Sequence, residues 1–150
     1  MTLVVTRVTT AEEKKINFEL RLQVFVEDQG YDVADEIDEH DEKDTTLYFL
    51  GKDTEQDKFV AAARVLMNPS TRTAKIGRVG LLPECRGKNY GVALMHGVEQ
   101  LVADVADTYV LSAVYHRKGF YEKCGYQCVN DEIYIERTVD HCLMMKKREE

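Results

Sequence analysis

A glycine-rich turn that runs directly into a long amphipathic helix restricts the fold of this chain more than any other feature. A β-branched segment over 73–82 precedes the turn, which reads Arg86-Gly87-Lys88-Asn89-Tyr90-Gly91. In the following segment the apolar residues recur at helical spacing: Leu94, Met95, Val98, Leu101, Val102 and Val105. The pattern predicts a strand, a short turn and a helix over 89–106.

This turn has the properties of an anion-binding loop. Backbone N–H groups at a helix N-terminus have no intrahelical partners, and the helix dipole adds positive potential there. Gly87 and Gly91 allow a ligand to approach the backbone, and Arg86 and Lys88 add positive charge. The turn therefore predicts a phosphate cradle. Its spacing matches neither GxxxxGK[ST] nor GxGxxG, so neither a P-loop nor a dinucleotide-binding fold is indicated.

The other segments predict a mixed sheet with helices on its faces. Apolar or β-branched runs predict strands over 3–5, 45–51, 59–67, 73–82, 109–114, 126–129, 132–135 and 141–145. Further helices are predicted over 11–28 and 118–124, and the first begins with a capping-box pattern at Thr10 and Glu13. The three strands between 45 and 82 are expected to form an antiparallel meander. The predicted class is α+β (mixed α/β), in a single domain over 1–150.

The charge of the chain is acidic and unevenly distributed. Lys and Arg number 20 and Asp and Glu number 27, for a net charge of -7. This balance argues against nucleic-acid binding, which needs a basic face. Ten carboxylates lie between Glu27 and Asp44, where Lys43 is the only Lys or Arg. Because such a segment resists burial, we interpret it as a loop with one short helix.

Cysteine spacing and hydropathy give expectations about metals and compartment. No two of the 4 cysteines form a CxxC pair, and no pair of histidines has metal-ligand spacing, so no metal is expected. The N-terminal residues lack a signal-peptide pattern, and no apolar run approaches the ~20 residues that cross a bilayer. We expect free thiols in a cytoplasmic protein, with the nucleus as the alternative, and no membrane partner.

Two motifs resemble the GNAT superfamily of N-acetyltransferases. The turn over 86–91 resembles that family's [RQ]-x-x-[GA]-x-[GA] acetyl-CoA pyrophosphate loop, and Phe120-Tyr121-Glu122-Lys123-Cys124-Gly125-Tyr126 resembles its FYxKxGF segment. Further positions are similar to the ElaA-like or YjcF-like subgroup: Arg21, Val24-Phe25-Val26, Gln29, Glu36-Ile37-Asp38, Gly77-Arg78-Val79 and His141-Cys142-Leu143-Met144-Met145-Lys146. The resemblance covers nearly the whole chain.

The resemblance implies a fold, an acyl donor and a reaction. The expected GNAT fold has a mostly antiparallel sheet with a V-shaped splay between strands 4 and 5. The expected acyl donor is acetyl-CoA, and the residues expected to contact it are Val79, Gly80, Leu81, Arg86, Gly87, Lys88, Asn89, Tyr90, Gly91, Phe120 and Lys123. The implied reaction is direct attack by a primary amine in a ternary complex.

The acceptor and the assembly are less narrowly defined. The expected acceptor is a small molecule such as an amino sugar, a polyamine or an amino-acid derivative. A protein amine, or a non-catalytic acyl-CoA-binding sensor domain, are the alternatives. A homodimer is the favoured assembly.

Acetyl transfer to an amine needs an acid, a base and donors for an oxyanion. The resemblance places Tyr121 near the cofactor sulfur as the acid, and the alternative is a core aromatic. For the base we consider Glu36, Asp38, Glu136 and His141; among these, His141 has an ordinary pKa near 6.5, and both it and Glu136 match subgroup positions. Backbone N–H groups near Val79–Leu81 are the expected oxyanion donors.

The acceptor side is expected to involve Arg21, Arg78, Glu36 and Asp38. Arg21 could line the acceptor pocket or pair with the acidic loop, and Arg78 could face the site or solvent. Glu36 and Asp38 could hold a cationic acceptor or remain solvated.

Three positions depart from the pattern of the resembled family and subgroup: Thr46 and Val114 replace a usual histidine and glutamine, and Asn89 replaces Gly or Ala. Asn tolerates the left-handed backbone region, so the loop should keep its function.

Overall fold

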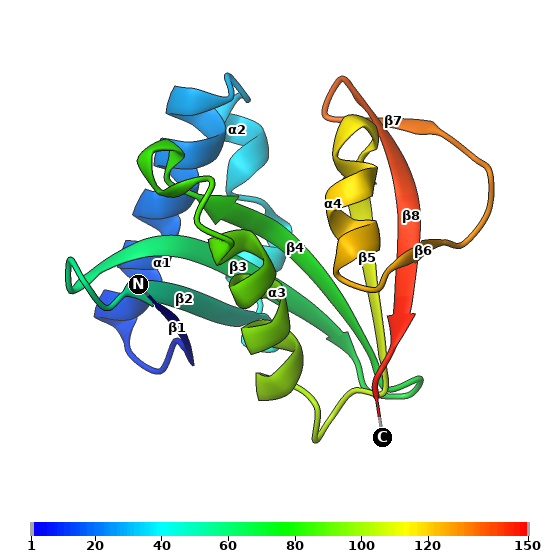
Figure 1. The fold of residues 1–150 in the computed structure, drawn as a ribbon, viewed down its shortest axis with the longest axis horizontal. Helices are drawn as coiled ribbons and strands as arrows, with labels where there is room; N and C mark the ends of the chain where they lie inside the picture. Colours follow the sequence, from blue (N-terminus) through cyan, green and yellow to red (C-terminus); the bar gives the residue numbers. More distant parts are fainter. Residues whose placement is uncertain (1, 150) are drawn as a thin grey trace.

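One mixed sheet organises the chain, and the computed structural model describes it over residues 2–149 (Figure 1). The strands are β1 (Leu3–Arg7), β2 (Leu47–Asp53), β3 (Lys58–Asn68), β4 (Thr73–Leu81), β5 (Thr108–Val114), β6 (Gln127–Cys128), β7 (Tyr134–Glu136) and β8 (Val139–Lys147). They follow the order β1-β2-β3-β4-β5-β8-β6, and β7 also pairs with β8. The predicted α+β class and the antiparallel meander β2–β3–β4 are confirmed.

Helices cover both faces of this sheet. They are α1 (Ala11–Arg21), the π-helix η1 (Leu22–Asp28), α2 (Val33–Glu36), α3 (Tyr90–Leu101), α4 (Lys118–Lys123) and the 3-10 segments η2 (Glu39–Glu42), η3 (Pro83–Cys85) and η4 (Tyr115–Arg117). In Figure 1, α1 and α2 lie behind the β1–β4 half, and α3 crosses in front of it. A Cβ at Gly97 of α3 would lie 2.5 Å from the side chain of Val5, so this glycine allows α3 to pack closely on β1.

The sheet opens into a V between β4 and β5. These parallel strands pair only from Thr73 to Lys75 on β4 and from Thr108 to Val110 on β5, and they then diverge (Figure 1). Beyond Lys75, the β5-facing edge of β4 has no strand partner within the described residues. The splay that the resemblance implied is therefore confirmed, and it exposes main-chain groups of β4 to a ligand.

A bulge in β4 lies beside this opening. Ala62 pairs with Gly80 and Arg64 pairs with Gly77, so two residues of β4, Arg78 and Val79, lie opposite one residue of β3. The backbone of Arg78 has a φ of 50°, in the left-handed region. Bulges bend a strand and redirect its side chains, and they are common next to active sites.

The N-terminal helix differs in detail from its prediction. Its capping box at Thr10 is present, but the regular α-helix ends at Arg21 and continues as a π-helix to Asp28. The Gln29 N–H donates to the Val24 carbonyl, five residues back. The acidic segment that follows holds two short helices, α2 and η2, where one was predicted, and Asp32 and Asp38 cap them. The spacing of apolar residues does not distinguish the hydrogen-bond pattern of an α-helix from that of a π-helix. In a sequence, a carboxylate that caps a helix also looks the same as one that is solvated.

Buried apolar side chains fill the space between the sheet and the helices. Among the largest are Phe49, Leu50, Ile76, Leu94, Met95 and Met144, all below 2% exposed. Over the described part of the chain, no helix has the length and hydropathy needed to cross a membrane.

Candidate active site

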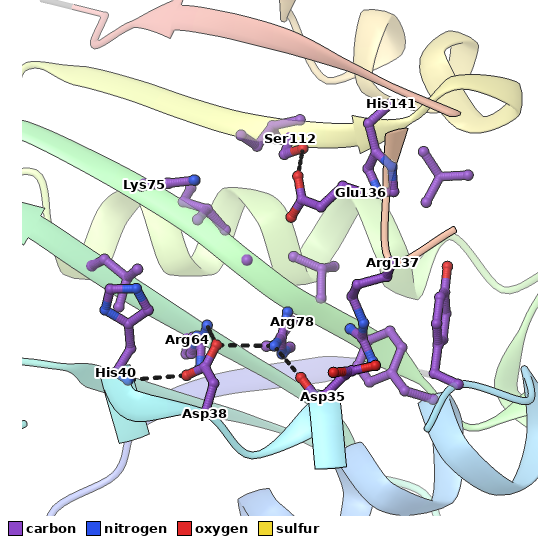
Figure 2. A pocket seen from close by; sticks show the side chains of 18 of the residues that line it. Asp35, Asp38, His40, Arg64, Lys75, Arg78, Ser112, Glu136, Arg137 and His141 are labelled. Carbon is purple, nitrogen blue, oxygen red and sulfur yellow. Dashed lines mark hydrogen bonds and ion pairs between the residues drawn. The ribbon is translucent and has the colours of Figure 1, made fainter. Parts of the chain in front are cut away.

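Two cavities meet where the sheet splays. The first, here called the loop cavity, has a volume of about 490 Å³ and is lined by the turn before α3, the end of β4 and α4. The second, the cleft cavity, has a volume of about 420 Å³ and lies between β4, β5, the β7–β8 hairpin and the acidic segment (Figure 2). The residues that line both cavities are Gln29, Val79, Arg117 and Tyr121. A ligand bound in one cavity could therefore contact a ligand bound in the other beside Val79 and Tyr121.

The backbone of the turn before α3 fits an anion. Gly87 has a φ of 85° and open space where a Cβ would lie, and Asn89 has a φ of 60°. The tolerance of asparagine for this region is thus used here, although its side chain makes no capping hydrogen bond. No Asp or Glu is among the described residues that line the loop cavity, whereas Arg86 and Lys123 are. The backbone N–H groups of the turn and the positive charge of Arg86 and Lys123 suit a polyphosphate.

Not every turn residue predicted to contact the acyl donor faces the loop cavity with its side chain. Lys88 is absent from the lining, and its ammonium lies 5.9 Å from the Tyr90 ring centroid. The Tyr90 hydroxyl is buried and donates to Asp53 Oδ1 at 3.1 Å, so this side chain anchors the turn to β2. Arg86 lines the cavity and forms an ion pair of 3.0 Å with Asp28.

The two aromatic residues of α4 have different roles in the geometry. Phe120 packs against Gly91, where a Cβ would lie 2.9 Å from its ring. Gly91 is therefore needed for the contact between α3 and α4, beyond any role in ligand approach. Tyr121 lies at the junction of the cavities, and its ring packs edge-on against the ring of Phe120, with 5.0 Å between the ring centroids. Burial raises the pKa of Tyr121 to about 12, so its hydroxyl keeps its proton at neutral pH.

The opposite wall of the cleft cavity carries the candidate bases Glu136 and His141. Glu136 Oε2 accepts a hydrogen bond of 2.7 Å from Ser112. His141 is buried, and its Nδ1 lies 2.7 Å from the Val139 carbonyl. Because a carbonyl only accepts hydrogen bonds, the neutral ring carries its proton on Nδ1 and leaves a lone pair on Nε2. Both side chains line the cavity and come from the β7–β8 hairpin (Figure 2).

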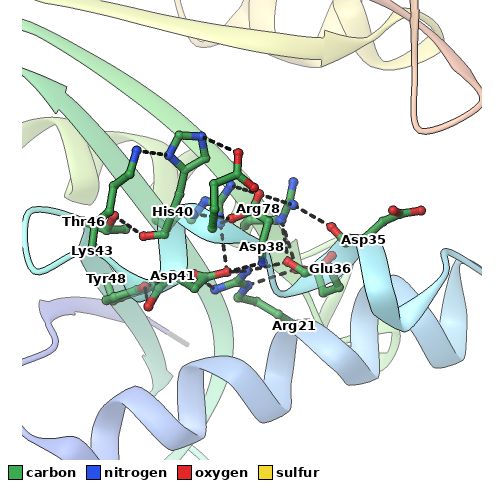
Figure 3. Close-up of polar contacts among 12 residues, drawn as sticks. Arg21, Asp35, Glu36, Asp38, His40, Asp41, Lys43, Thr46, Tyr48 and Arg78 are labelled. Atoms are coloured by element: carbon green, nitrogen blue, oxygen red, sulfur yellow. Dashed lines mark hydrogen bonds and ion pairs between the residues drawn. The ribbon is translucent and has the colours of Figure 1, made fainter.

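Arginines neutralise the inward-facing carboxylates of the acidic segment (Figure 3). Arg21 is fully buried; it donates to Glu36 Oε2 at 3.0 Å and to both oxygens of Asp41 at 2.9 Å. Arg64 donates to both oxygens of Asp38, at 2.7 and 2.8 Å. We call these residues, with Arg78 and Arg137, the arginine–carboxylate cluster.

This cluster corrects two expectations about the acceptor side. The side chains of Arg21 and Glu36 are 0% exposed, so neither can line the acceptor pocket, and the ion-pair alternative for Arg21 is the one found. Asp38 and Arg78 do line the cleft cavity. Burial alone would raise the pKa of Asp38, but the hydrogen bonds and charge of Arg64 outweigh it and lower that pKa.

Sequence reasoning missed Arg64, Asp41 and Arg137. Arg137 lies in the β7–β8 turn and reaches across the splay to Glu36 Oε1 at 2.9 Å, a contact between residues 101 positions apart. Arg64 appears in the sequence as one cation within a strand, and Asp41 as one of ten carboxylates. In the structure, Arg64 lies next to the bulge and Arg137 has a positive φ, but neither feature is visible in the sequence.

The remaining notable positions carry no chemistry of their own. Thr46 is buried and donates to the His40 carbonyl, whereas Val114 lines the cleft cavity. Burial raises the pKa of the Cys124 and Cys142 thiols, which disfavours a nucleophilic thiolate. Within residues 2–149, no group of three or more His, Cys, Asp or Glu side chains could hold a metal ion.

Comparisons with known proteins agree with this geometry. The family profile described as acetyltransferase (GNAT) matches residues 14–126. YjcF of Bacillus subtilis (strain 168), described as an uncharacterized N-acetyltransferase, is 29% identical over 137 residues, or 90% of this chain and 93% of YjcF. The crystal structure of Escherichia coli ElaA is 25% identical with a TM-score of 0.82, and the match covers 97% of this chain and 100% of ElaA.

More distant structures share the fold. Spermidine N-acetyltransferase from Vibrio cholerae, solved in complex with CoA and spermine, has a TM-score of 0.67 at 20% identity, covering 97% of this chain and 95% of that chain. At this identity the likeness shows the fold alone.

Proposed function

This chain belongs to the acetyltransferase (GNAT) family, and on that premise we propose that it transfers the acetyl group of acetyl-CoA to a primary amine of a small molecule by direct attack in a ternary complex. The observation that carries the proposal is the meeting of the loop cavity and the cleft cavity at Val79 and Tyr121. One cavity suits a polyanionic donor, and the other has room for an amine. A protein of the same fold has been solved in complex with CoA and spermine, so the fold has room for a small amine beside its acyl donor.

The residues of the loop cavity would hold the donor. Acetyl-CoA supplies an activated thioester and a thiolate leaving group. The turn backbone at Gly87 and Asn89, together with Arg86 and Lys123, would bind its phosphates. The unpaired edge of β4 at Val79–Leu81 presents main-chain N–H groups, which can stabilise negative charge on an oxygen.

The residues of the cleft cavity would prepare the amine. An alkyl amine with a pKa of ~10.4 is neutral in only about one molecule in a few thousand at pH 7, so a proton must be removed. His141 Nε2 has the free lone pair needed for this, and Glu136 carries a carboxylate on the same wall. Tyr121 holds its proton at neutral pH and can donate it where the two cavities meet.

Thiol release from acetyl-CoA against a panel of amines tests this function, with mass spectrometry of the amine as the second readout. We expect at least one small amine to gain an acetyl group with release of one CoA thiol. If acetyl-CoA binds but no small amine or protein amine is acetylated, the chain is a non-catalytic acyl-CoA-binding sensor domain and the proposal is wrong. If only protein amines react, the chain is a protein N-acetyltransferase.

A further inference from the structure

The carboxylates of the arginine–carboxylate cluster have no capacity left for an ammonium group. Glu36 accepts from Arg21 and Arg137 and forms a third ion pair, of 3.2 Å, with Arg78. Asp38 accepts from Arg64 through both oxygens, and its Oδ2 also accepts from Arg78 at 3.2 Å. A cationic acceptor could reach these oxygens only by displacing guanidinium groups that are already in hydrogen-bond contact (Figure 3).

On the walls of the cleft cavity, by contrast, some N–H groups of cationic side chains have no partner among the described residues. Arg137 Nε is buried and has no hydrogen-bond partner among residues 2–149. Lys75 and Arg117 line the same cavity, and neither forms an ion pair or a side-chain hydrogen bond with any residue in the described range. Figure 2 shows Lys75 and Arg137 on different walls of the cavity. An unpaired buried donor is costly, and a ligand oxygen would satisfy it.

The charge of the cavity has the opposite sign to that of the whole chain. Its lining holds five cations against three carboxylates: Arg64, Lys75, Arg78, Arg117 and Arg137 against Asp35, Asp38 and Glu136. Adding the buried Arg21, Glu36 and Asp41 gives six cations against five carboxylates. The chain as a whole has a net charge of -7. The cavity is thus an electropositive site in an acidic protein.

The position of Arg137 is itself unusual. Glu136 pairs with Val139, so Arg137 and Thr138 form a two-residue hairpin turn, and their φ angles are 51° and 66°. Such a turn favours Asn-Gly, because both residues need the left-handed region. Strained non-glycine residues of this kind cluster at ligand clamps. The Arg137 guanidinium also lies 4.1 Å from the Tyr31 ring centroid, which fixes its plane at the cavity wall.

We propose that the acceptor is an amine that also carries an oxyanion, either a carboxylate or a phosphate, and that Arg137 binds this group with Lys75 and Arg117 contributing charge. The amine end then lies toward His141, Glu136 and Tyr121. Arginine presents a planar fork that matches an oxyanion. This inference rests on the proposed transfer and narrows its acceptor class; it disfavours a polyamine, which has no anionic group for these cations.

Matched pairs of amines test the inference in the transferase assay. Tyrosine is compared with tyramine, lysine with cadaverine, and phosphoethanolamine with ethanolamine, so the arms separate carboxylate from phosphate. We expect one oxyanion class to exceed its partners that lack the oxyanion at least tenfold in kcat/KM. In Arg137→Gln this advantage should fall below about threefold through KM, while Arg137→Lys keeps part of it and the exposed Lys147→Gln control keeps all of it. Equal or reversed preference within every pair would overturn the inference and leave acetyl transfer intact.

Binding of the acetylated products separates this inference from the proposed function. With CoA present, N-acetyltyrosine should raise the melting temperature of the wild-type protein more than N-acetyltyramine, and O-phospho-N-acetylethanolamine more than N-acetylethanolamine, in at least one pair. That difference should vanish in Arg137→Gln. If it appears without any turnover, the oxyanion site stands and the transfer proposal fails. If neither pair differs, the oxyanion site is refuted whatever the turnover.

Discussion

Replacing Asp41 with asparagine should strongly destabilise the protein, because Asp41 is the centre of a buried charge network. Its side chain is 1% exposed and accepts from Arg21, Arg64 and Tyr48. The cluster has four guanidinium groups and three carboxylates, and Asp41→Asn leaves four against two. Breaking a buried pair by removing one partner costs about 3–5 kcal/mol.

The measurement is urea denaturation of both proteins at pH 7, followed by a thermal scan. For a chain of this length, each kcal/mol shifts the melting temperature by about 2–4 °C, so the expected loss is about 6–20 °C. The control is Asp44→Asn, since Asp44 is exposed and forms no ion pair among the described residues. It should stay within about 0.5 kcal/mol of wild type.

The pH dependence gives the prediction a second, independent check. Burial would raise the pKa of Asp41, but the hydrogen bonds and charge of Arg21 lower it well below the ordinary 3.8. A carboxyl with a depressed folded-state pKa stabilises fully above its unfolded value and loses that contribution as the pH falls below it. The gap between wild type and Asp41→Asn should therefore be constant from pH 7 to about 5 and narrow below 3.8. A loss under about 1 kcal/mol at pH 7, or a gap that widens in acid, would refute the reasoning.

Three further changes probe the two cavities. In Gly91→Val the new Cβ would lie 2.9 Å from the ring of Phe120, so the substitution should lower both the melting temperature and the affinity for CoA measured by calorimetry. Gly119→Ala is the control, because a Cβ there meets open space, and it should change neither value. Arg86→Gln should weaken CoA binding several-fold and reduce its salt dependence, measured by titration at two ionic strengths, and unchanged affinity would remove Arg86 from the phosphate site. His141→Asn should lower kcat more than tenfold while CoA affinity stays the same, and an unchanged rate would shift the base role to Glu136 or water.

The succession of strands and helices along the chain, and the turn before α3, could be predicted because they depend on local patterns. The apolar stripe from Leu94 to Val105 and the glycines at 87 and 91 predicted a helix over 89–106 and its entry turn. The structure has both, but the helix ends earlier, at Leu101. The resemblance supplied what local patterns cannot, namely the V-shaped opening between β4 and β5.

The arginine–carboxylate cluster could not be predicted, because its partners are distant in sequence. A run of ten carboxylates looks solvated until Arg64 and Arg137, 26 and 101 positions from their partners, are brought beside it. From the sequence, Glu36 and Asp38 could either hold a cationic acceptor or remain solvated. In the folded chain arginines neutralise Glu36, Asp38 and Asp41, and the cleft cavity is lined by more cations than carboxylates.

The most direct test of the central claim, that chemistry takes place where the two cavities meet, is the kcat of Tyr121→Phe. Removing the hydroxyl should lower kcat at least tenfold with the best acceptor, while CoA affinity changes less than about twofold, because the ring still packs against Phe120. Tyr115→Phe, at an exposed tyrosine outside both cavities, should leave both values unchanged. A Tyr121→Phe protein with wild-type kcat would contradict the claim that this hydroxyl takes part in the transfer.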